Sequence, residues 1–331
     1  MLRFFPNPRE EREFEEESRR VVEILDPSYE TRGSWNPIRV KEDIPPKVLF
    51  VDGVRRTEFR TAIFDDNRFL GEAIFISIGA GVLKVNLSSG RSNYELINPI
   101  VERYFIYHTE KDIEVPPVWE SEIGDYLLKF QSLKSPSGNL GKLANLQMGK
   151  LELQVAFSSH SGDSFLIMDG PVKKNRFLDN VAYLVKEQKN IYLQGREEII
   201  FKLKKGYRTP LFLFEEQVGG LTKDGRYKSG KVKKLACYVC LTDRIGLNDP
   251  TINLARIELP YTDDGERAIQ TAERAAAVAL LFANNPLRDF RAPQNLTTIA
   301  FLEKQLRRYL GEHGLIRRKI GEIIFSAAFG G

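Results

Sequence analysis

Cysteine, histidine and methionine are scarce in this 331-residue chain, which holds 2 Cys, 3 His and 3 Met. Two cysteines are too few for a disulfide framework. Cys237 and Cys240 lie three residues apart in a segment rich in strand formers, an offset that places side chains on opposite faces of a strand. No second Cys or His pair has the spacing that completes a four-ligand zinc site. Both thiols are therefore expected to be ordinary buried groups.

Long apolar runs and a strong net charge are also missing. The longest apolar run, Ala275 to Ala283, is about half of the ~20 residues that a membrane-spanning helix needs. The N-terminus reaches Pro6 and Pro8 without the apolar stretch of a secretory signal, so we expect a cytoplasmic protein that does not contact a membrane. The net charge of +4 excludes a polybasic protein, and any nucleic-acid site must be a local patch.

Several common catalytic motifs are absent. The sequence has no G-x-x-x-x-G-K-[ST] phosphate loop, so we do not expect the chain to hydrolyse ATP. Gly79-Ala-Gly81 lacks the third glycine and the following helix of a dinucleotide site. The three histidines are too scattered for an H-E-x-x-H metal motif.

The sequence divides into two regions that differ in composition. Arg9 to Ile24 is a Glu/Arg-rich helix candidate that follows Pro8, and a proline-punctuated connector continues to residue 46. Residues 1–46 are thus predicted to be an N-terminal helical extension and connector. The whole chain is 42% hydrophobic, which allows one large domain or two small ones with a buried core, and we predict that residues 47–331 form one domain.

The apolar pattern of residues 47–331 predicts strands first and then alternating helices and strands. Val48–Val51 reads as a buried strand that stops at Asp52-Gly53, and two further strand-rich segments follow as an antiparallel meander. Asn139–Phe157 has the helical period, and Phe165–Met168 is a second apolar strand that stops at Asp169-Gly170. The later expectations are helices at 178–189, 267–282 and 296–310 and strands at 211–214, 235–241 and 257–259. The fold class is α/β, a mixed sheet flanked by helices.

Three carboxylates stand out on these elements. Asp52 and Asp169 each follow a buried strand, where an open α/β sheet forms its ligand sites. Each Asp-Gly pair is also compatible with a plain turn. Glu152 borders the apolar stripe of the 139–157 helix, and a solvated role is its alternative.

Together these acids suggest a metal centre. Phosphodiester hydrolysis uses divalent ions that activate water and neutralise developing charge, and two ions about 3.5–4 Å apart are bridged by carboxylates from different elements. Mg²⁺ and Mn²⁺ select oxygen ligands. The predicted order along the chain is three strands, then a helix, then a fourth strand. With such acids on these elements, this order is the arrangement of the ribonuclease H-like nucleases.

The motifs of the chain resemble those of the NurA nucleases, and of their bacterial branch in particular. The acidic motifs are Phe50-Val-Asp52-Gly53, Glu152 and Leu166-Ile-Met-Asp169-Gly170-Pro. The later blocks are Val185-Lys186-Glu187, Gly206-Tyr-Arg-Thr-Pro-Leu-Phe212, Arg256-Ile-Glu-Leu-Pro260 and Pro293-Gln-Asn-Leu296 with Leu302-Glu303. The resemblance covers residues 48–318.

The resemblance implies a ribonuclease H-like fold, a homodimer, and 5′-to-3′ exonuclease and single-strand endonuclease activity on DNA with Mn²⁺ or Mg²⁺. The chemistry of phosphodiester hydrolysis favours two such ions. It also implies work with a HerA-type hexameric ATPase in DNA end resection and recombinational repair. Asp52, Glu152 and Asp169 become the metal ligands. Many members place a Tyr and a His near the start of a late helix, where this chain has Phe290 and Pro293-Gln-Asn295. Either Asn295 supplies a neutral oxygen ligand, or that part of the site differs.

Local basic charge is the expected contact to DNA. Thr222–Lys234 is predicted to be a mobile basic loop in which Lys231, Lys233 and Lys234 meet phosphates and Tyr227 stacks on a base. Lys186 is placed to approach the scissile phosphate. A solvated loop and a surface lysine are the alternatives.

Two rival functions remain open at this point. One is a non-catalytic module that binds single-stranded DNA or scaffolds the ATPase through a degenerate site. The other is a ribonuclease H-like enzyme that acts on RNA or branched DNA. The role of Glu258 is also open. It is either a further metal ligand or the partner of Arg256 in a structural ion pair, because the two residues share a strand face.

Overall fold

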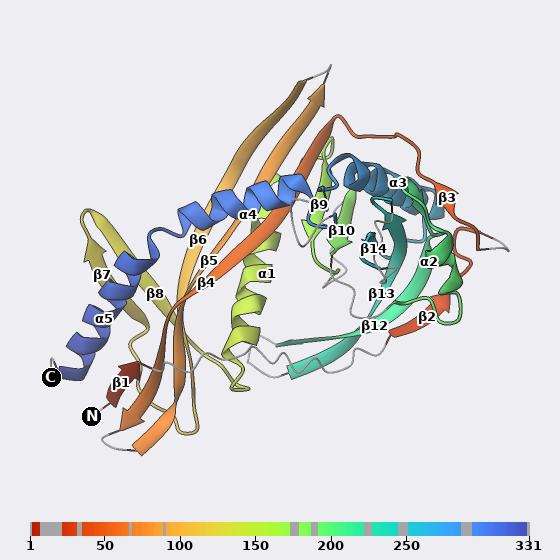
Figure 1. Cartoon of the computed structure of the whole chain (residues 1–331). Coiled ribbons are helices and arrows are strands. Elements are labelled where there is room, and N and C mark those ends of the chain that lie inside the picture. Colours follow the sequence, from red (N-terminus) through yellow and green to blue (C-terminus); the bar gives the residue numbers. More distant parts are fainter. Residues whose placement is uncertain are drawn as a thin grey trace.

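The computed structural model describes residues 2–6, 22–31, 35–65, 68–88, 91–172, 179–186, 191–221, 227–243, 251–285 and 293–329. Figure 1 shows a long, strongly twisted sheet with helices on both faces. The strands are β1 (Leu2–Pro6), β2 (Val22–Asp26), β3 (Ile38–Arg39), β4 (Lys47–Asp65), β5 (Arg68–Ser88), β6 (Arg91–Thr109), β7 (Val118–Ile123), β8 (Tyr126–Lys134), β9 (Phe165–Asp169), β10 (Val181–Val185), β11 (Tyr207–Arg208), β12 (Phe212–Leu221), β13 (Tyr227–Cys240) and β14 (Leu254–Pro260). The helices are α1 (Leu140–Ser159), α2 (Glu198–Lys202), α3 (Gly265–Leu281), α4 (Thr297–Tyr309) and α5 (His313–Phe329).

The sheet is mixed, as the sequence predicts. Its main path runs β2-β12-β13-β14-β10-β9-β4-β5-β6-β8-β7. The segments β4, β5 and β6 form the predicted antiparallel meander. After α1 the chain returns as β9, parallel to β4, and β10 then lies parallel to β9. The α/β class and the helix-flanked mixed sheet are confirmed.

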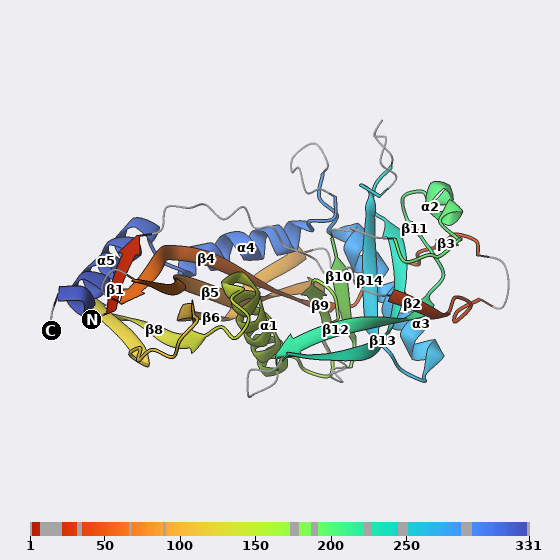
Figure 2. The same ribbon diagram turned by 90° about the horizontal axis from the view of Figure 1, so that it is seen from below.

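Side chains along β4 alternate between two hydrophobic clusters. Val48 and Phe50 belong to the cluster that α3 and α4 complete, whereas Leu49 and Val51 belong to the cluster that α1 completes. Successive side chains of a strand point to opposite faces. Therefore α4 and α1 cover opposite faces of the sheet (Figure 2). Burying each such Leu, Val or Phe side chain contributes about 1.5–3 kcal/mol, which fixes the register of β4.

Three of the long helices lie close to their predicted bounds. The periodic segments at 139–157, 267–282 and 296–310 form α1, α3 and α4. Asn139 caps α1, because its side chain accepts a hydrogen bond from the backbone N–H of Lys142. The last helix, α5, was not predicted.

Two segments were predicted wrongly. The helix expected over 178–189 contains β10, in which all five residues are buried. A short run that is apolar throughout carries no period that separates a buried strand from a helix. The mobile loop expected from Thr222 to Lys234 is wrong from Tyr227 onward, where β13 pairs with β12 in a long hairpin. Residues 222–226 lie outside the described residues.

The N-terminal region contributes strands to the main sheet. Residues 9–21 of the expected helix lie outside the described residues. At the end of that helix the prediction is wrong, because Val22–Asp26 form β2, which pairs with β12. The segment β1 pairs with β4, and β3 pairs with β11. Glu30 of the connector accepts two hydrogen bonds from the buried guanidinium of Arg208. The described part of residues 1–46 is therefore built into the sheet.

The two cysteines are free and buried, as predicted. Cys237 packs in the cluster that includes α3 and α4, and Cys240 packs in the cluster beneath α2. The opposite-face placement expected from their spacing is confirmed. Among the described helices, none has the length and apolar character needed to cross a bilayer.

Candidate metal centre

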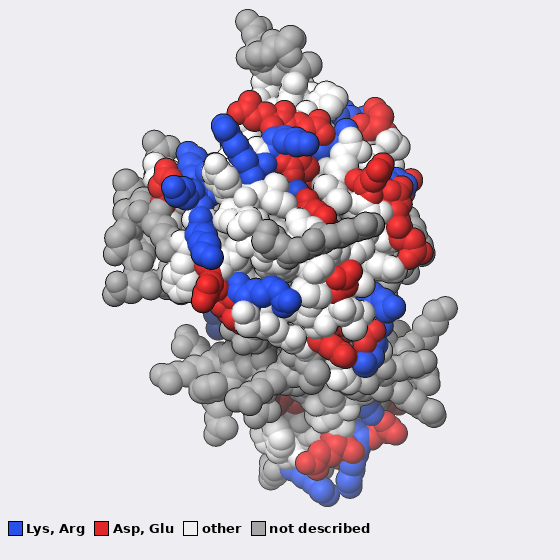
Figure 3. Space-filling model, turned by 90° about the vertical axis from the view of Figure 1, so that its right-hand side faces the viewer, with Lys and Arg blue, Asp and Glu red and all other residues white. Residues whose placement is uncertain are grey.

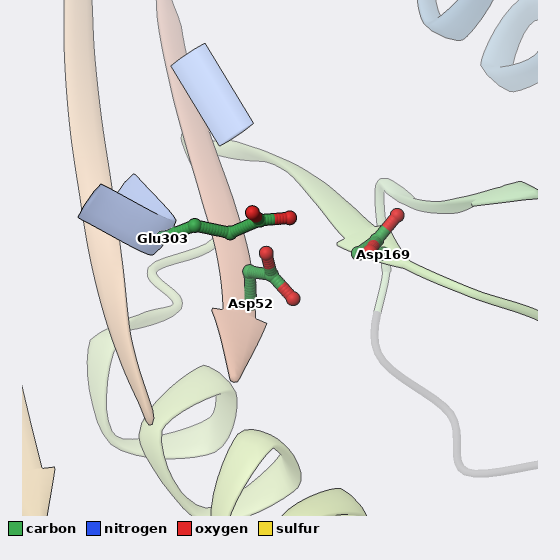
Figure 4. Close-up of side chains that lie close together, drawn as sticks. All are labelled: Asp52, Asp169 and Glu303. Atoms are coloured by element: carbon green, nitrogen blue, oxygen red, sulfur yellow. The ribbon is translucent and has the colours of Figure 1, made fainter. Parts of the chain in front are cut away.

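Three acidic side chains from three elements meet beside the centre of the sheet. Asp52 lies on β4, Asp169 ends β9, and Glu303 lies on α4 (Figure 4). One carboxylate oxygen of each lies within 4.8 Å of the others. In Figure 4 the carboxylates of Asp52 and Glu303 lie next to each other and face the end of β9 that carries Asp169. Oxygen atoms this close to one another could serve as ligands of a single divalent cation.

Strand register explains why the two aspartates meet. Val51 of β4 pairs with Met168 of β9, so the next residue on each parallel strand is an aspartate. Both aspartates follow the alternation of their strands and point to the α4 face, as Phe50 and Ile167 do. The sequence-predicted pair Asp52 and Asp169 is thus brought together.

The Asp-Gly pairs were both expected to end their strands. This is right for Asp169, where β9 ends and Gly170 takes a φ of 89°. It is wrong for Asp52, because β4 continues through Gly53 to Asp65. Gly53 serves a close approach instead: a Cβ there would lie 2.7 Å from Oε1 of Glu152.

Glu303 was missed as a ligand by reasoning from the sequence. It lies four residues after Ile299 on α4, whose apolar stripe continues through Leu302 and Leu306 into the sheet. A carboxylate at the border of an apolar stripe is the signal that singled out Glu152, and the same signal is present here. Because α4 covers the face to which both aspartates point, Glu303 completes their group.

The electrostatics of the centre are those of partly paired acids in a site of low exposure. Asp52 is 5% exposed, and its Oδ2 atom is buried without a hydrogen-bond partner in the described part of the chain. Burial raises the pKa of Asp52 well above its usual range, and the nearby Asp169 raises it further. Burial also raises the pKa of Asp169, although Lys186 opposes that effect. An unpartnered buried carboxylate oxygen is costly until a cation or a proton satisfies it.

Two more of the predicted site residues, Lys186 and Asn295, lie at this centre. Lys186 directly follows β10, and its Nζ atom lies 2.9 Å from Oδ2 of Asp169 and 3.5 Å from Oε1 of Glu303. The same Nζ donates a hydrogen bond of 3.1 Å to Oδ1 of Asn295, which is fully buried just before α4. Burial alone would lower the pKa of Lys186, but Asp169 and Asp52 together raise it, which favours the charged ammonium form.

Glu152 lies beside the centre but outside the compact group. It projects from α1, on the face opposite α4, and reaches the backbone of β4 at Gly53. On that face, burial and the charge of Glu152 raise the pKa of Tyr183 to about 12. The assignment of Glu152 as a metal ligand stays a prediction.

The lysines predicted to bind DNA have different surroundings. Lys234 is fully buried and forms ion pairs with Glu216 and Glu258, so its assignment to DNA contact is wrong. A buried ammonium between two carboxylates cannot reach a phosphate. Lys231 is exposed but pairs with Glu215 and Glu23.

Lys233 is exposed, and its Nζ atom lies 5.8 Å from the ring centre of Tyr261. The side chain of Tyr227 lies outside the described residues. Blue and red side chains are interspersed on the face shown in Figure 3, which carries no broad basic patch among its described residues. Residues 227–234 belong to the β12–β13 hairpin, and the DNA-contact assignments of Lys231, Lys233 and Tyr227 stay predictions.

Glu258 makes a structural ion pair, one of the two alternatives that the sequence left open. Its Oε1 accepts a hydrogen bond of 2.9 Å from Nε of Arg256, and its Oε2 accepts one of 3.0 Å from the backbone N–H of Val172. The second bond anchors the segment that follows Asp169. Glu258 thus holds the chain around the centre and lies outside the acidic group itself.

Neither a protein-family model nor a curated protein matches this chain.

Proposed function

We propose that this protein is a metal-dependent deoxyribonuclease whose centre is formed by Asp52, Asp169 and Glu303. The observation that carries the proposal is the buried Oδ2 atom of Asp52, which has no hydrogen-bond partner in the described part and faces two further carboxylates. A buried cluster of acids is unstable by itself and becomes favourable when a cation is bound.

The donor set fits a hard divalent cation such as Mn²⁺ or Mg²⁺. All of its donors are oxygen atoms from carboxylates on different elements. When bound, such an ion activates water and neutralises the charge that develops on a phosphodiester. Asp52, Asp169 and Glu303 would hold it. Asp52 is buried and the other two are partly buried between the sheet and α4, which reduces the screening of their charge by solvent.

The strand arrangement supports a ribonuclease H-like nuclease. Within the sheet, the neighbouring strands are β6-β5-β4-β9-β10. The first three pair antiparallel, and β9 and β10 continue parallel to β4. In the sequence, α1 lies between β6 and β9, after the short hairpin of β7 and β8. An acid in the first of these strands and an acid at the end of the fourth match the acidic motifs of that arrangement. The proposed ribonuclease H-like fold rests on this order.

The resemblance to the NurA nucleases supplies the substrate and the partner of the proposal. DNA ends are the proposed substrate, with 5′-to-3′ exonuclease and single-strand endonuclease activity in end resection. A HerA-type hexameric ATPase and a second copy of this chain are the proposed partners. The sequence has no phosphate loop of its own, which is consistent with a separate motor.

The direct test is cleavage of end-labelled single-stranded DNA by the full-length chain with Mn²⁺ and with EDTA. We expect Asp52→Asn and Asp169→Asn to lower the rate by at least a hundredfold, because each amide removes a charge from the cation site. The matched control is Asp163→Asn, which alters an exposed aspartate paired with Lys47. Full activity of either centre variant would refute the assignment.

The same assay separates the nuclease from the binding module. If the wild-type chain bound the labelled strand and left it intact in Mn²⁺, the non-catalytic alternative would replace the nuclease. Parallel reactions on RNA and on branched DNA test the remaining rival. Rapid cleavage of RNA with no cleavage of DNA would reassign the substrate and leave the metal centre in place.

A further inference from the structure

The ammonium group of Lys186 is placed as a cation within the acidic centre. Three oxygen atoms surround its Nζ: Oδ2 of Asp169 at 2.9 Å, Oδ1 of Asn295 at 3.1 Å and Oε1 of Glu303 at 3.5 Å. Two of these oxygens belong to members of the group that would hold a metal ion. The side chain of Lys186 is only 14% exposed, so the ammonium is held within the protein and is not merely a surface counter-charge.

The two carboxylate oxygens of Asp52 differ in their hydrogen bonding. Its Oδ1 accepts a hydrogen bond of 2.7 Å from the backbone N–H of Gly53, and its Oδ2 is the buried atom without a partner. The centre therefore has two sides. Lys186 contacts the side formed by Asp169, Asn295 and Glu303, and Oδ2 of Asp52 is the side at which a divalent ion would bind.

We propose that Lys186 occupies one of the two cation positions of this centre, so that each chain binds one divalent ion at a time. This inference rests on the proposed function and replaces the expectation of two ions. In a two-ion site a shared carboxylate bridges ions about 3.5–4 Å apart. Here Asp169 would be the shared carboxylate, because the ammonium of Lys186 already lies 2.9 Å from its Oδ2.

The net charge of the acidic group and Lys186 favours the binding of one divalent ion. With all three carboxylates ionised, the group and the ammonium of Lys186 carry two negative charges, which one divalent ion would neutralise. A second divalent ion would have to enter beside a fixed ammonium in a buried site, where the repulsion between cations is weakly screened. Asn295 favours the ammonium too, because its amide oxygen fixes Nζ without adding a charge.

The test is the number of Mn²⁺ ions that the metal-free, full-length chain binds, counted by calorimetric titration and native mass spectrometry. We expect one ion per chain and an electron paramagnetic resonance spectrum of isolated Mn²⁺. Two ions per chain with a spin-coupled spectrum would overturn the proposal and leave the nuclease function standing. No bound ion would overturn the proposed function itself, so the two failures are distinguishable.

A variant tests Lys186 directly. Lys186→Met removes the ammonium and keeps an unbranched side chain, and we expect the count to rise from one ion to two. The control is Lys84→Met, which removes a lysine from its ion pair with Glu95 away from the centre and should leave one ion. A Lys186→Met chain that still bound one ion would contradict the proposal. Should that variant fail to fold, the wild-type count and spectrum decide the question alone.

Discussion

Glu152 of α1 contacts β4 at the one residue of that region without a side chain, Gly53. A Cβ at residue 53 would lie 2.7 Å from Oε1 of Glu152 and 2.8 Å from Cγ of Met148. Real Cβ atoms essentially never come this close to a neighbour. The glycine after Asp52 therefore exists for the packing of α1 on the sheet and not for a turn.

The first prediction follows from this contact. Gly53→Ala should displace the carboxylate of Glu152 and lower the free energy of unfolding by about 1–3 kcal/mol, the usual cost of overpacking. Urea denaturation measures the change. The control is Gly162→Ala, at a position where a Cβ meets nothing within 4 Å. Equal stability of the two variants would show that α1 adjusts freely around residue 53.

The second prediction concerns Glu303. Glu303→Gln should weaken Mn²⁺ binding at least tenfold, a change of about 1.4 kcal/mol, because the centre loses one of its three carboxylates. Calorimetric titration measures the affinity, and cleavage of labelled DNA should fall with it. Glu322→Gln alters an exposed glutamate paired with Lys319 and should change neither. Wild-type Mn²⁺ affinity in Glu303→Gln would return the third-ligand role to Glu152.

The third prediction compares the contributions of Lys234 and Lys231, both on β13, to stability. Lys234→Met leaves the buried carboxylates of Glu216 and Glu258 without their ammonium, and should cost about 3–5 kcal/mol of stability. Lys231→Met removes an exposed ion pair, and the unfolding midpoint in urea should not move measurably. If both variants unfolded at the wild-type midpoint, the burial of Lys234 would be disproved.

The fourth prediction concerns the thiols. Burial raises the pKa of Cys237 to about 12 from an ordinary value near 9, although Arg208 opposes the shift. The folded chain should therefore react with Ellman's reagent at pH 8 only after unfolding, when both thiols become accessible. Rapid reaction of the native chain at pH 8 would contradict this.

The same shift has a consequence for stability. A raised thiol pKa means that the folded state favours the protonated form of Cys237, so its contribution is complete below about pH 9 and is lost as the pH rises towards about 12. The free energy of unfolding should fall over that interval. Cys237→Ala should show a smaller fall, measured by urea denaturation at several pH values.

Much of the fold and two of the three acids of the centre follow from the sequence by itself. Continuous apolar runs are typical of buried strands, and the acids that directly follow them, Asp52 and Asp169, were assigned to the centre on that basis. The helical period of α1, α3 and α4 fixed those helices within a few residues, because a helix must bury one stripe. The spacing of Cys237 and Cys240 was enough to place them on opposite faces.

The rest was decided by tertiary structure. Glu303 is far from Asp52 in sequence, and only the packing of α4 on one face of the sheet brings it to the aspartates and leaves Glu152 on the other. Lys186 follows a run that is apolar throughout, and no local pattern shows that this run is a strand beside Asp169. Lys234 looks like a surface charge until two carboxylates bury it. Sequence periodicity determines which face of an element is buried, whereas the partners of a buried charge depend on which elements meet there.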